Sequence, residues 1–293
     1  MITQNIGWRW LFWVVSIFSG LVTVVGVFLF AEPYAEKILA RKAKGMRKAT
    51  GGDYYAEQER STQTMWQVLK VTLTRPVRLL FTQPTLQVMS IFMAYNFGIN
   101  YIMFSTFADL WTQHYGQSVS HSGLNYIALA IGNTIAAQGG ARFTDRIWAH
   151  LKNKAGGDTA PEYRVPMMIP GSLLIPLGLF RYGWAGEMRA YWVITDIGVG
   201  IFATGIILGT QAMQAYVLDS FPKYTSSASA ASQFLRSVTA FAFPIFAPSM
   251  YSALGYGWGN SLLGFLSLII GLPAPLLLWK FGARLRARGK EQW

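Results

Sequence analysis

The sequence predicts an all-α membrane protein with seven transmembrane helices. Of its 293 residues, 52% are hydrophobic and only 13% are charged, about half the ~25% charged share of soluble domains. Seven apolar runs are each long enough for the ~20 residues that cross a bilayer as a helix. The chain contains no cysteine, which excludes a disulfide scaffold, a thiolate metal cluster and a cysteine nucleophile.

The predicted spans cover residues 10–30, 86–108, 123–141, 165–182, 191–211, 227–251 and 260–279. The first run is too long for the core of a signal peptide, and no basic region precedes it, so we expect it to be retained as a span. Gly205 and Gly209 form a Gly-x-x-x-Gly pair in the fifth span, which lets a neighbouring helix approach closely.

Basic residues mark one side of the membrane. Of the 25 Lys and Arg, ten lie in segment 32–83, five between residues 142 and 164, one at Lys223 and five in the tail from Lys280. The alternate connections contain almost none, so the positive-inside rule predicts an outside N-terminus and a cytoplasmic C-terminus. The same asymmetry argues against nucleic acid as a partner.

The long segment after the first span has two parts. A charged stretch from Glu36 to a Gly-Gly break at 51–52 predicts a short basic helix and a linker. Residues 64–81 alternate apolar and polar side chains at helical spacing, which predicts an interfacial amphipathic helix interrupted at Pro76. A soluble linker helix is the alternative.

Polar residues within the spans are the candidates for function, because such groups are costly in hydrocarbon. The second span interleaves tyrosines and asparagines with phenylalanines, a lining that suits a bulky, weakly polar ligand. Amide bonds between helices are the alternative interpretation. The candidate substrate-cavity residues are Tyr95, Asn96, Asn100, Tyr101, Gln211 and Gln214.

Ionisable residues inside the spans are few. Asp196, near the outer end of the fifth span, is a possible proton site, with an exposed interfacial position as the alternative. No histidine lies in a span, and nothing resembles a phosphate loop, a nucleophile elbow or a metalloprotease helix. We therefore expect neither an enzyme nor a catalytic residue, and no metal or cofactor.

Several longer motifs carry a family resemblance. They are GWRWLFWVVSIFSG, AEPYAEKILARKAKGMRK, ARFTDR, PEYRVPMMIPGSLLIPLGLFRYGW, QAYVLDSFPKYTSSASAASQFLRS and FPIFAPSMYSALGYGWGNSLL. The chain resembles the fungal drug:proton antiporters of the major facilitator superfamily over nearly its whole length. The resemblance implies one half of a twelve-helix efflux pump that exports hydrophobic drugs or secondary metabolites in exchange for protons, by alternating access. Such pumps confer multidrug resistance.

The resemblance also implies a domain organisation. Residues 1–31 match the last helix of the N-terminal half, 32–83 the cytoplasmic central loop, 84–281 the six-helix C-terminal half, and 282–293 a basic cytoplasmic tail. The first five helices of the family pattern have no counterpart, so we expect an N-terminally truncated transporter of the cell membrane whose partners are a hydrophobic small molecule, protons, the lipid bilayer and a missing N-terminal half.

A cytoplasmic gate network is carried over from the family's loop motif. Asp145 and Arg146 match its Asp-Arg pair, although Ala141 stands where the strict motif has glycine. We expect Arg146 to reach Asp219, with Arg236 nearby.

Two other interpretations remain open at this point. The chain is a non-transporting remnant or an incomplete gene model, or it is a seven-helix receptor, which the span count superficially suggests. The 32–83 segment, the lack of cysteine in the outer loops and the transporter motifs argue against the receptor.

Overall fold

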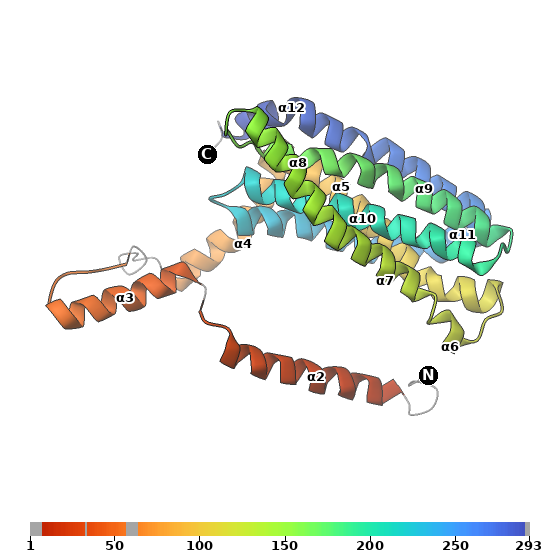
Figure 1. The fold of residues 1–293 in the computed structure, drawn as a ribbon, viewed down its shortest axis with the longest axis horizontal. Coiled ribbons are helices and arrows are strands. Elements are labelled where there is room, and N and C mark those ends of the chain that lie inside the picture. Colours follow the sequence, from red (N-terminus) through yellow and green to blue (C-terminus); the bar gives the residue numbers. More distant parts are fainter. Residues whose placement is uncertain (1–7, 33, 57–63, 291–293) are drawn as a thin grey trace. The chain divides into compact units, whose positions relative to one another are not determined.

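The computed structural model describes residues 8–32, 34–56 and 64–290, and helices form all of the regular secondary structure in these ranges (Figure 1). The chain divides into two compact units, Met1–Lys70 and Val71–Trp293. The first contains α2 (Trp8–Leu29) and α3 (Ala35–Thr50), and α4 (Met65–Thr82) runs from the first unit into the second.

The second unit contains the remaining helices. They are α5 (Pro84–Asp109), η2 (Leu110–His114), α6 (Val119–Ser122), α7 (Tyr126–Ile135), η3 (Ala136–Gly140), α8 (Ala141–Lys154), η4 (Pro161–Met167), α9 (Met168–Glu187), α10 (Trp192–Ser220), α11 (Thr225–Gly271) and α12 (Pro273–Lys290). The described part of the chain is therefore all-α, as predicted.

Five of the described helices are long and apolar enough to cross a membrane: Phe12–Leu29, Pro84–His114, Pro161–Glu187, Trp192–Ser220 and Thr225–Arg288. The last has 64 residues and contains both the sixth and the seventh predicted spans. The third predicted span, 123–141, folds into α7, η3 and the start of α8 but is not one of the five. Its crossing of the membrane stays a prediction.

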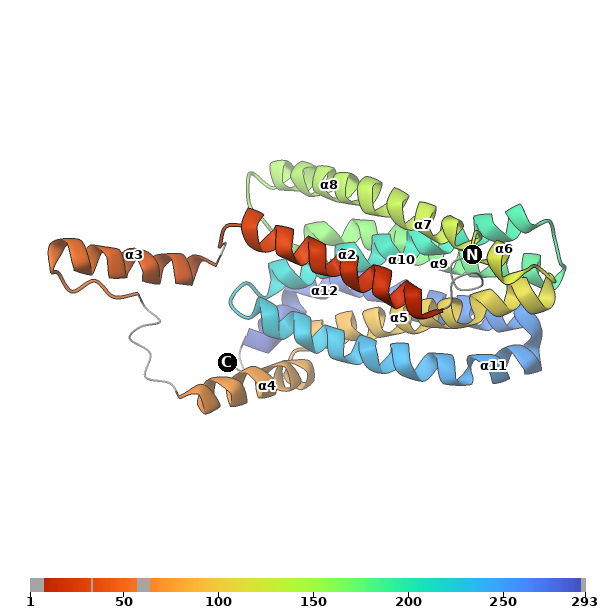
Figure 2. The same cartoon turned by 90° about the horizontal axis from the view of Figure 1, so that it is seen from below.

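Helix α11 is divided into two segments by a kink that lies between the predicted spans 227–251 and 260–279. Gly255, at this kink, has φ 70° and ψ 177°, a left-handed conformation that favours glycine. Figure 2 shows the two segments of α11 running in opposite directions. The amides of Tyr256 and Gly257 donate to the Glu187 carboxylate at 2.7 and 3.1 Å. A carboxylate at the start of a helix satisfies its free N–H groups and the positive end of its dipole.

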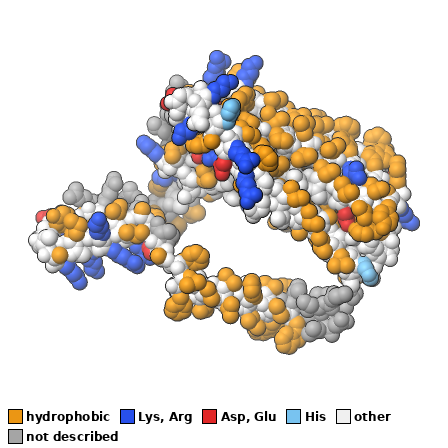
Figure 3. Space-filling model, in the orientation of Figure 1, with side chains coloured by type: hydrophobic (Ala, Val, Ile, Leu, Met, Phe, Trp, Pro, Cys, Tyr) orange, Lys and Arg blue, Asp and Glu red, His pale blue; other side chains and the backbone are white. Residues whose placement is uncertain are grey.

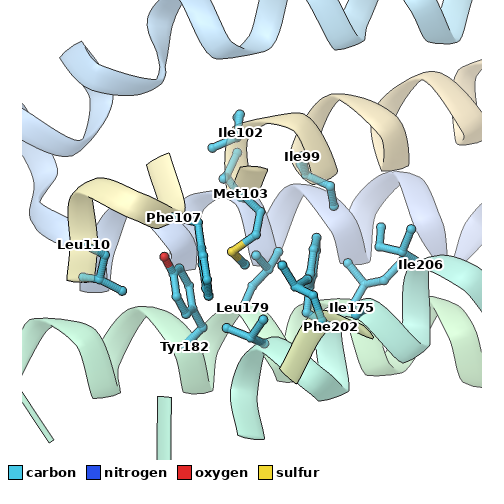
Figure 4. Close-up of a cluster of buried hydrophobic side chains, with 14 of the residues drawn as sticks. Ile99, Ile102, Met103, Phe107, Leu110, Ile175, Leu179, Tyr182, Phe202 and Ile206 are labelled. Carbon is cyan, nitrogen blue, oxygen red and sulfur yellow. The ribbon is translucent and has the colours of Figure 1, made fainter. Parts of the chain in front are cut away.

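The core of the second unit lies where α5, α9 and α10 meet. Phe107 of α5, Tyr182 of α9 and Phe202 of α10 are completely buried there (Figure 4). A second apolar cluster joins α5 and α10 to α12 near the opposite end, around Phe92, Met213 and Leu278. These clusters hold the transmembrane helices in one unit and fix the positions of their polar side chains.

Glycines bring α9 and α10 into direct backbone contact. A Cβ at Gly178 would lie 2.6 Å from the Cα of Phe202, and one at Gly205 would lie 2.8 Å from the amide nitrogen of Ile175. Neither position has room for a methyl group. The close approach predicted for the glycines of the fifth span is confirmed.

Helix α2 and the first half of α4 expose apolar side chains. None of the apolar stretch of α2 is buried, and in α4 Trp66 and Leu73 are exposed by 77% and 65%.

The interruption expected at Pro76 is wrong, because α4 continues through it. A proline inside a helix removes one backbone hydrogen bond, while the flanking bonds remain. Figure 3 shows Lys and Arg side chains gathered over α3 and over the end of the second unit where α8 and α12 finish.

Candidate functional site

A large cavity lies along the first half of α10. Its volume is about 1160 Å³, and its walls come from α6, α7 and α10, with Leu174 contributed by α9. Isoleucines at 127, 131, 135, 197 and 201 make most of the surface apolar. The polar side chains of the lining are Gln117, Ser118, His121, Asn125, Asp196 and Thr204.

Asp196 is the acidic residue of this lining. It is partly buried, and its Oδ1 is shielded from solvent without a hydrogen-bond partner among the described residues. The preceding residue is held in place, since the Tyr115 hydroxyl lies 2.9 Å from Thr195 Oγ1 and donates to the Ala190 carbonyl at 2.9 Å. The structure thus places Asp196 on a cavity wall, while its role as a proton site stays a prediction.

The predicted substrate residues of α5 lie outside this cavity and do not share one face. Tyr95 is buried, and its hydroxyl donates to the Leu263 carbonyl. Asn96 is fully buried, with neither amide atom paired within the described structure. Asn100 is partly buried, and Tyr101 is 44% exposed. Tyr95 and Asn96 therefore pack between helices, whereas Tyr101 lies at an open surface.

The two predicted glutamines of α10 also lie away from the cavity. Gln211 is exposed, whereas Gln214 is partly buried and its Nε2 donates to Ser229 Oγ of α11 at 3.3 Å. The structure does not bring the six residues together, and their contact with substrate stays a prediction.

An arginine that the gate prediction omitted bridges two of its carboxylates. Arg164 of η4 donates through Nη1 to Asp145 Oδ1 at 3.0 Å and through Nε to Asp219 Oδ2 at 3.1 Å. Its side chain is 20% exposed, and its guanidinium lies 5.3 Å from the Trp148 ring centre. This bridge ties α8, η4 and α10 together at one end of the unit.

The expected pairing of Arg146 with Asp219 is therefore corrected. Arg146 follows Asp145 on an exposed turn of α8, where its guanidinium lies 5.9 Å from the ring centre of Phe143. Arg236 stacks on Phe97 at 3.9 Å and belongs to no ion pair of the described residues. In the sequence, the signal for Arg164 is its position directly before the predicted span 165–182, which by itself indicates only a cytoplasmic charge.

A second ion-pair cluster, around Arg286, was not predicted from the sequence. Arg286 of α12 donates to both carboxylate oxygens of Glu162 and to the Tyr216 hydroxyl at 3.1 Å. The side chains of Arg286 and Glu162 are only 17% and 13% exposed. The cluster joins η4, α10 and α12, whose residues lie far apart in the sequence, so no local pattern could indicate it.

Removing the Arg164 side chain should weaken this end of the unit. We expect Arg164→Met to lower the free energy of unfolding by about 1–2 kcal/mol, because two carboxylates lose their cation but remain partly hydrated. The matched control, Arg146→Met, should change it by less than about 0.5 kcal/mol. Denaturant titration of the detergent-solubilised chain measures both, and equal effects would contradict the assignment of Arg164 as the bridging cation.

The comparisons with known proteins agree with the fold. The sequence model of the Major Facilitator Superfamily matches residues 1–244. The efflux pump vrtL of Penicillium aethiopicum is 42% identical over 283 residues, which cover 97% of this chain and 56% of that protein. The uncharacterized transporter C1529.01 of Schizosaccharomyces pombe is 39% identical over 98% of this chain and 58% of its own length.

A third relative is the probable efflux pump mfs2 of Aspergillus flavus, 40% identical over 98% of this chain and 68% of that protein. The chain thus spans 56% to 68% of the length of these curated relatives. No solved structure matches it significantly. The family match contradicts the receptor interpretation and confirms the predicted resemblance: the chain belongs to the Major Facilitator Superfamily.

Proposed function

We propose that the chain forms the C-terminal transport half of a proton-coupled exporter of bulky hydrophobic molecules, with α2 as the last helix of the N-terminal half. Three of its relatives are named as transporters or efflux pumps. In this proposal the N-terminus lies outside and the basic ends of α8 and α12 lie in the cytoplasm of a cell-membrane protein. A second half supplies the rest of the substrate path, since transporter sites lie between repeats.

The cavity along α10 carries the proposal. Its volume of about 1160 Å³ and its apolar walls suit an organic ligand of drug size. Asp196 places an acidic group in this apolar lining, and an ionisable group at membrane depth is typical of a proton or substrate pathway. Uptake of a proton by Asp196 and release of substrate would be coupled because both occur at one cavity, and loss of that proton would accompany binding of the next substrate.

The Arg164 bridge supplies a cytoplasmic gate in this proposal. It joins α8 to the end of α10 through Asp145 and Asp219. We infer that opening of the cytoplasmic side separates these helix ends, so that the two ion pairs favour the closed arrangement. Arg164 takes the role that the sequence assigned to Arg146.

Vesicle transport tests the proposed function. We compare the chain alone with the chain joined to the N-terminal half of the Aspergillus flavus relative, and follow a lipophilic fluorescent dye under an imposed proton gradient. Gradient-driven dye flux by the joined protein, with little or none by the chain alone, supports the proposal. Absence of flux from both proteins, with both correctly folded, removes it.

Neutralising Asp196 should separate transport from binding. In the joined protein we expect Asp196→Asn to abolish the proton-driven component of flux, because asparagine cannot release a proton, while dye binding persists. Asp109→Asn is the matched control, since Asp109 is exposed and does not line the cavity. Flux is measured with and without the gradient; retained coupling in Asp196→Asn would show that another group carries the proton.

A further inference from the structure

Helix α3 has a cationic face and an apolar face on opposite sides. Lys37, Arg41, Lys44 and Lys48 follow one another at intervals of four, three and four residues, so they lie along one side of the helix. Leu39, Ala43 and Met46 repeat at the same intervals on the opposite side. Lys42 and Arg47 lie at the two borders between these faces.

Both faces are open to their surroundings. On the apolar side Leu39 is 58% exposed and Met46 is 37% exposed, and Ile38 beside them is 46% exposed. Lys37 pairs with Glu32 at 2.7 Å, which lowers the pKa of that carboxyl. Arg41, Lys44 and Lys48 are exposed, and none has a carboxylate within ion-pair distance in the described residues. In water, such a helix leaves apolar side chains unburied on one side and carries excess positive charge on the other.

The position of α3 in the chain restricts what can cover it. Only residues 30–34 separate it from the end of α2 at Leu29. An extended chain of that length reaches at most roughly 20 Å, and α2 is long and apolar enough to cross a bilayer. The start of α3 is therefore held beside the headgroups on the side where α2 leaves the membrane.

We propose that α3 lies in the interface of an anionic bilayer leaflet, with Leu39 and Met46 inserted among the acyl chains and the cations facing lipid phosphate and carboxylate groups. A membrane surface satisfies both faces at once: it buries the apolar side, and its negative potential attracts the basic side. A soluble acidic partner would pair with the cations and leave the apolar side in water. The helix ends at Thr50, and the next residue, Gly51, has a φ of 66° that lets the chain turn away.

This interaction does not depend on transport. It requires only α2, α3 and an anionic membrane, so it would hold equally in a protein that moves no substrate. Its failure and the failure of the proposed function are therefore separate results.

Fluorescence of a single label on the apolar face tests the proposal in the full chain. Because the sequence has no cysteine, Leu39→Cys creates one attachment site for an environment-sensitive dye. The labelled chain is reconstituted into vesicles of phosphatidylcholine alone, or of phosphatidylcholine with phosphatidylserine. We expect a blue shift of the dye and protection from an aqueous quencher only with phosphatidylserine, both reversed by high salt, which screens the surface potential.

Charge variants provide the matched comparison. The triple variant Arg41→Gln, Lys44→Gln, Lys48→Gln should lose the shift. The control Lys154→Gln, Arg284→Gln, Arg288→Gln, which removes the same net charge from exposed positions on α8 and α12, should retain it. Circular dichroism of each variant checks that the helices are intact.

Two results would overturn the proposal. Equal shifts in the two kinds of vesicle, or in the two triple variants, would show that charge on α3 does not drive the contact. A dye that remains accessible to the quencher with phosphatidylserine, but becomes protected on addition of a soluble polyacidic peptide, would assign the face to a protein partner instead.

Discussion

Gly178→Ala is expected to destabilise the second unit by about 3 kcal/mol, at the upper end of the usual cost of overpacking. The added Cβ would lie 2.6 Å from the Cα of Phe202, which is backbone and cannot rotate away. Helices α9 and α10 would have to separate, and the buried cluster around Tyr182 and Phe202 would lose contacts. Denaturant unfolding in detergent, followed by tryptophan fluorescence, measures the loss.

Gly139→Ala is the control for that substitution. A Cβ at Gly139 meets nothing within 4 Å, so the exchange should be neutral or stabilise the helix by up to ~1 kcal/mol through lower backbone entropy in the unfolded chain. If both alanine variants were equally stable, the tight contact between α9 and α10 would be wrong.

The second large effect is expected from Arg286→Met. It leaves the Glu162 carboxylate, only 13% exposed, without its cation, and we expect a loss of about 2–4 kcal/mol in the free energy of unfolding. The double variant Arg286→Met, Glu162→Gln should recover most of this loss, because no uncompensated charge then remains buried. The same unfolding assay applied to both single variants and the double variant gives the coupling energy.

Additive losses would contradict this pairing. If the double variant were less stable than the unmodified chain by the sum of the two single effects, Glu162 and Arg286 would contribute independently. The difference between recovery and addition exceeds the error of such assays, so the experiment decides between them.

Composition and charge distribution were sufficient to predict an all-α membrane protein, and the resemblance carried by the long motifs indicated its family, because these signals extend over long segments. The individual contacts were harder to predict. Asp145 and Arg146 are adjacent in a recognisable motif, yet the cation that reaches Asp145 is Arg164, brought there by the turn between α8 and η4. A motif specifies residue types along the chain, whereas an ion pair depends on how separate helices are placed.

The substrate residues illustrate a different limit. In α5 the apolar residues surround the helix on all sides, so the pattern does not indicate which polar residues face inward. The structure buries Asn96 and leaves Tyr101 at the surface. Of the candidate site residues only Asp196 lies in the cavity along α10, whose surface is mostly apolar like that of any membrane helix.

The turn at Gly255 has a mechanical consequence. Glu187 holds the first amides after that turn, so the end of α9 and both segments of α11 are fastened together at one point. A rearrangement that parts these three ends must first break two short N–H···O bonds to a carboxylate. We therefore expect these three helix ends to move together when the remaining helices tilt.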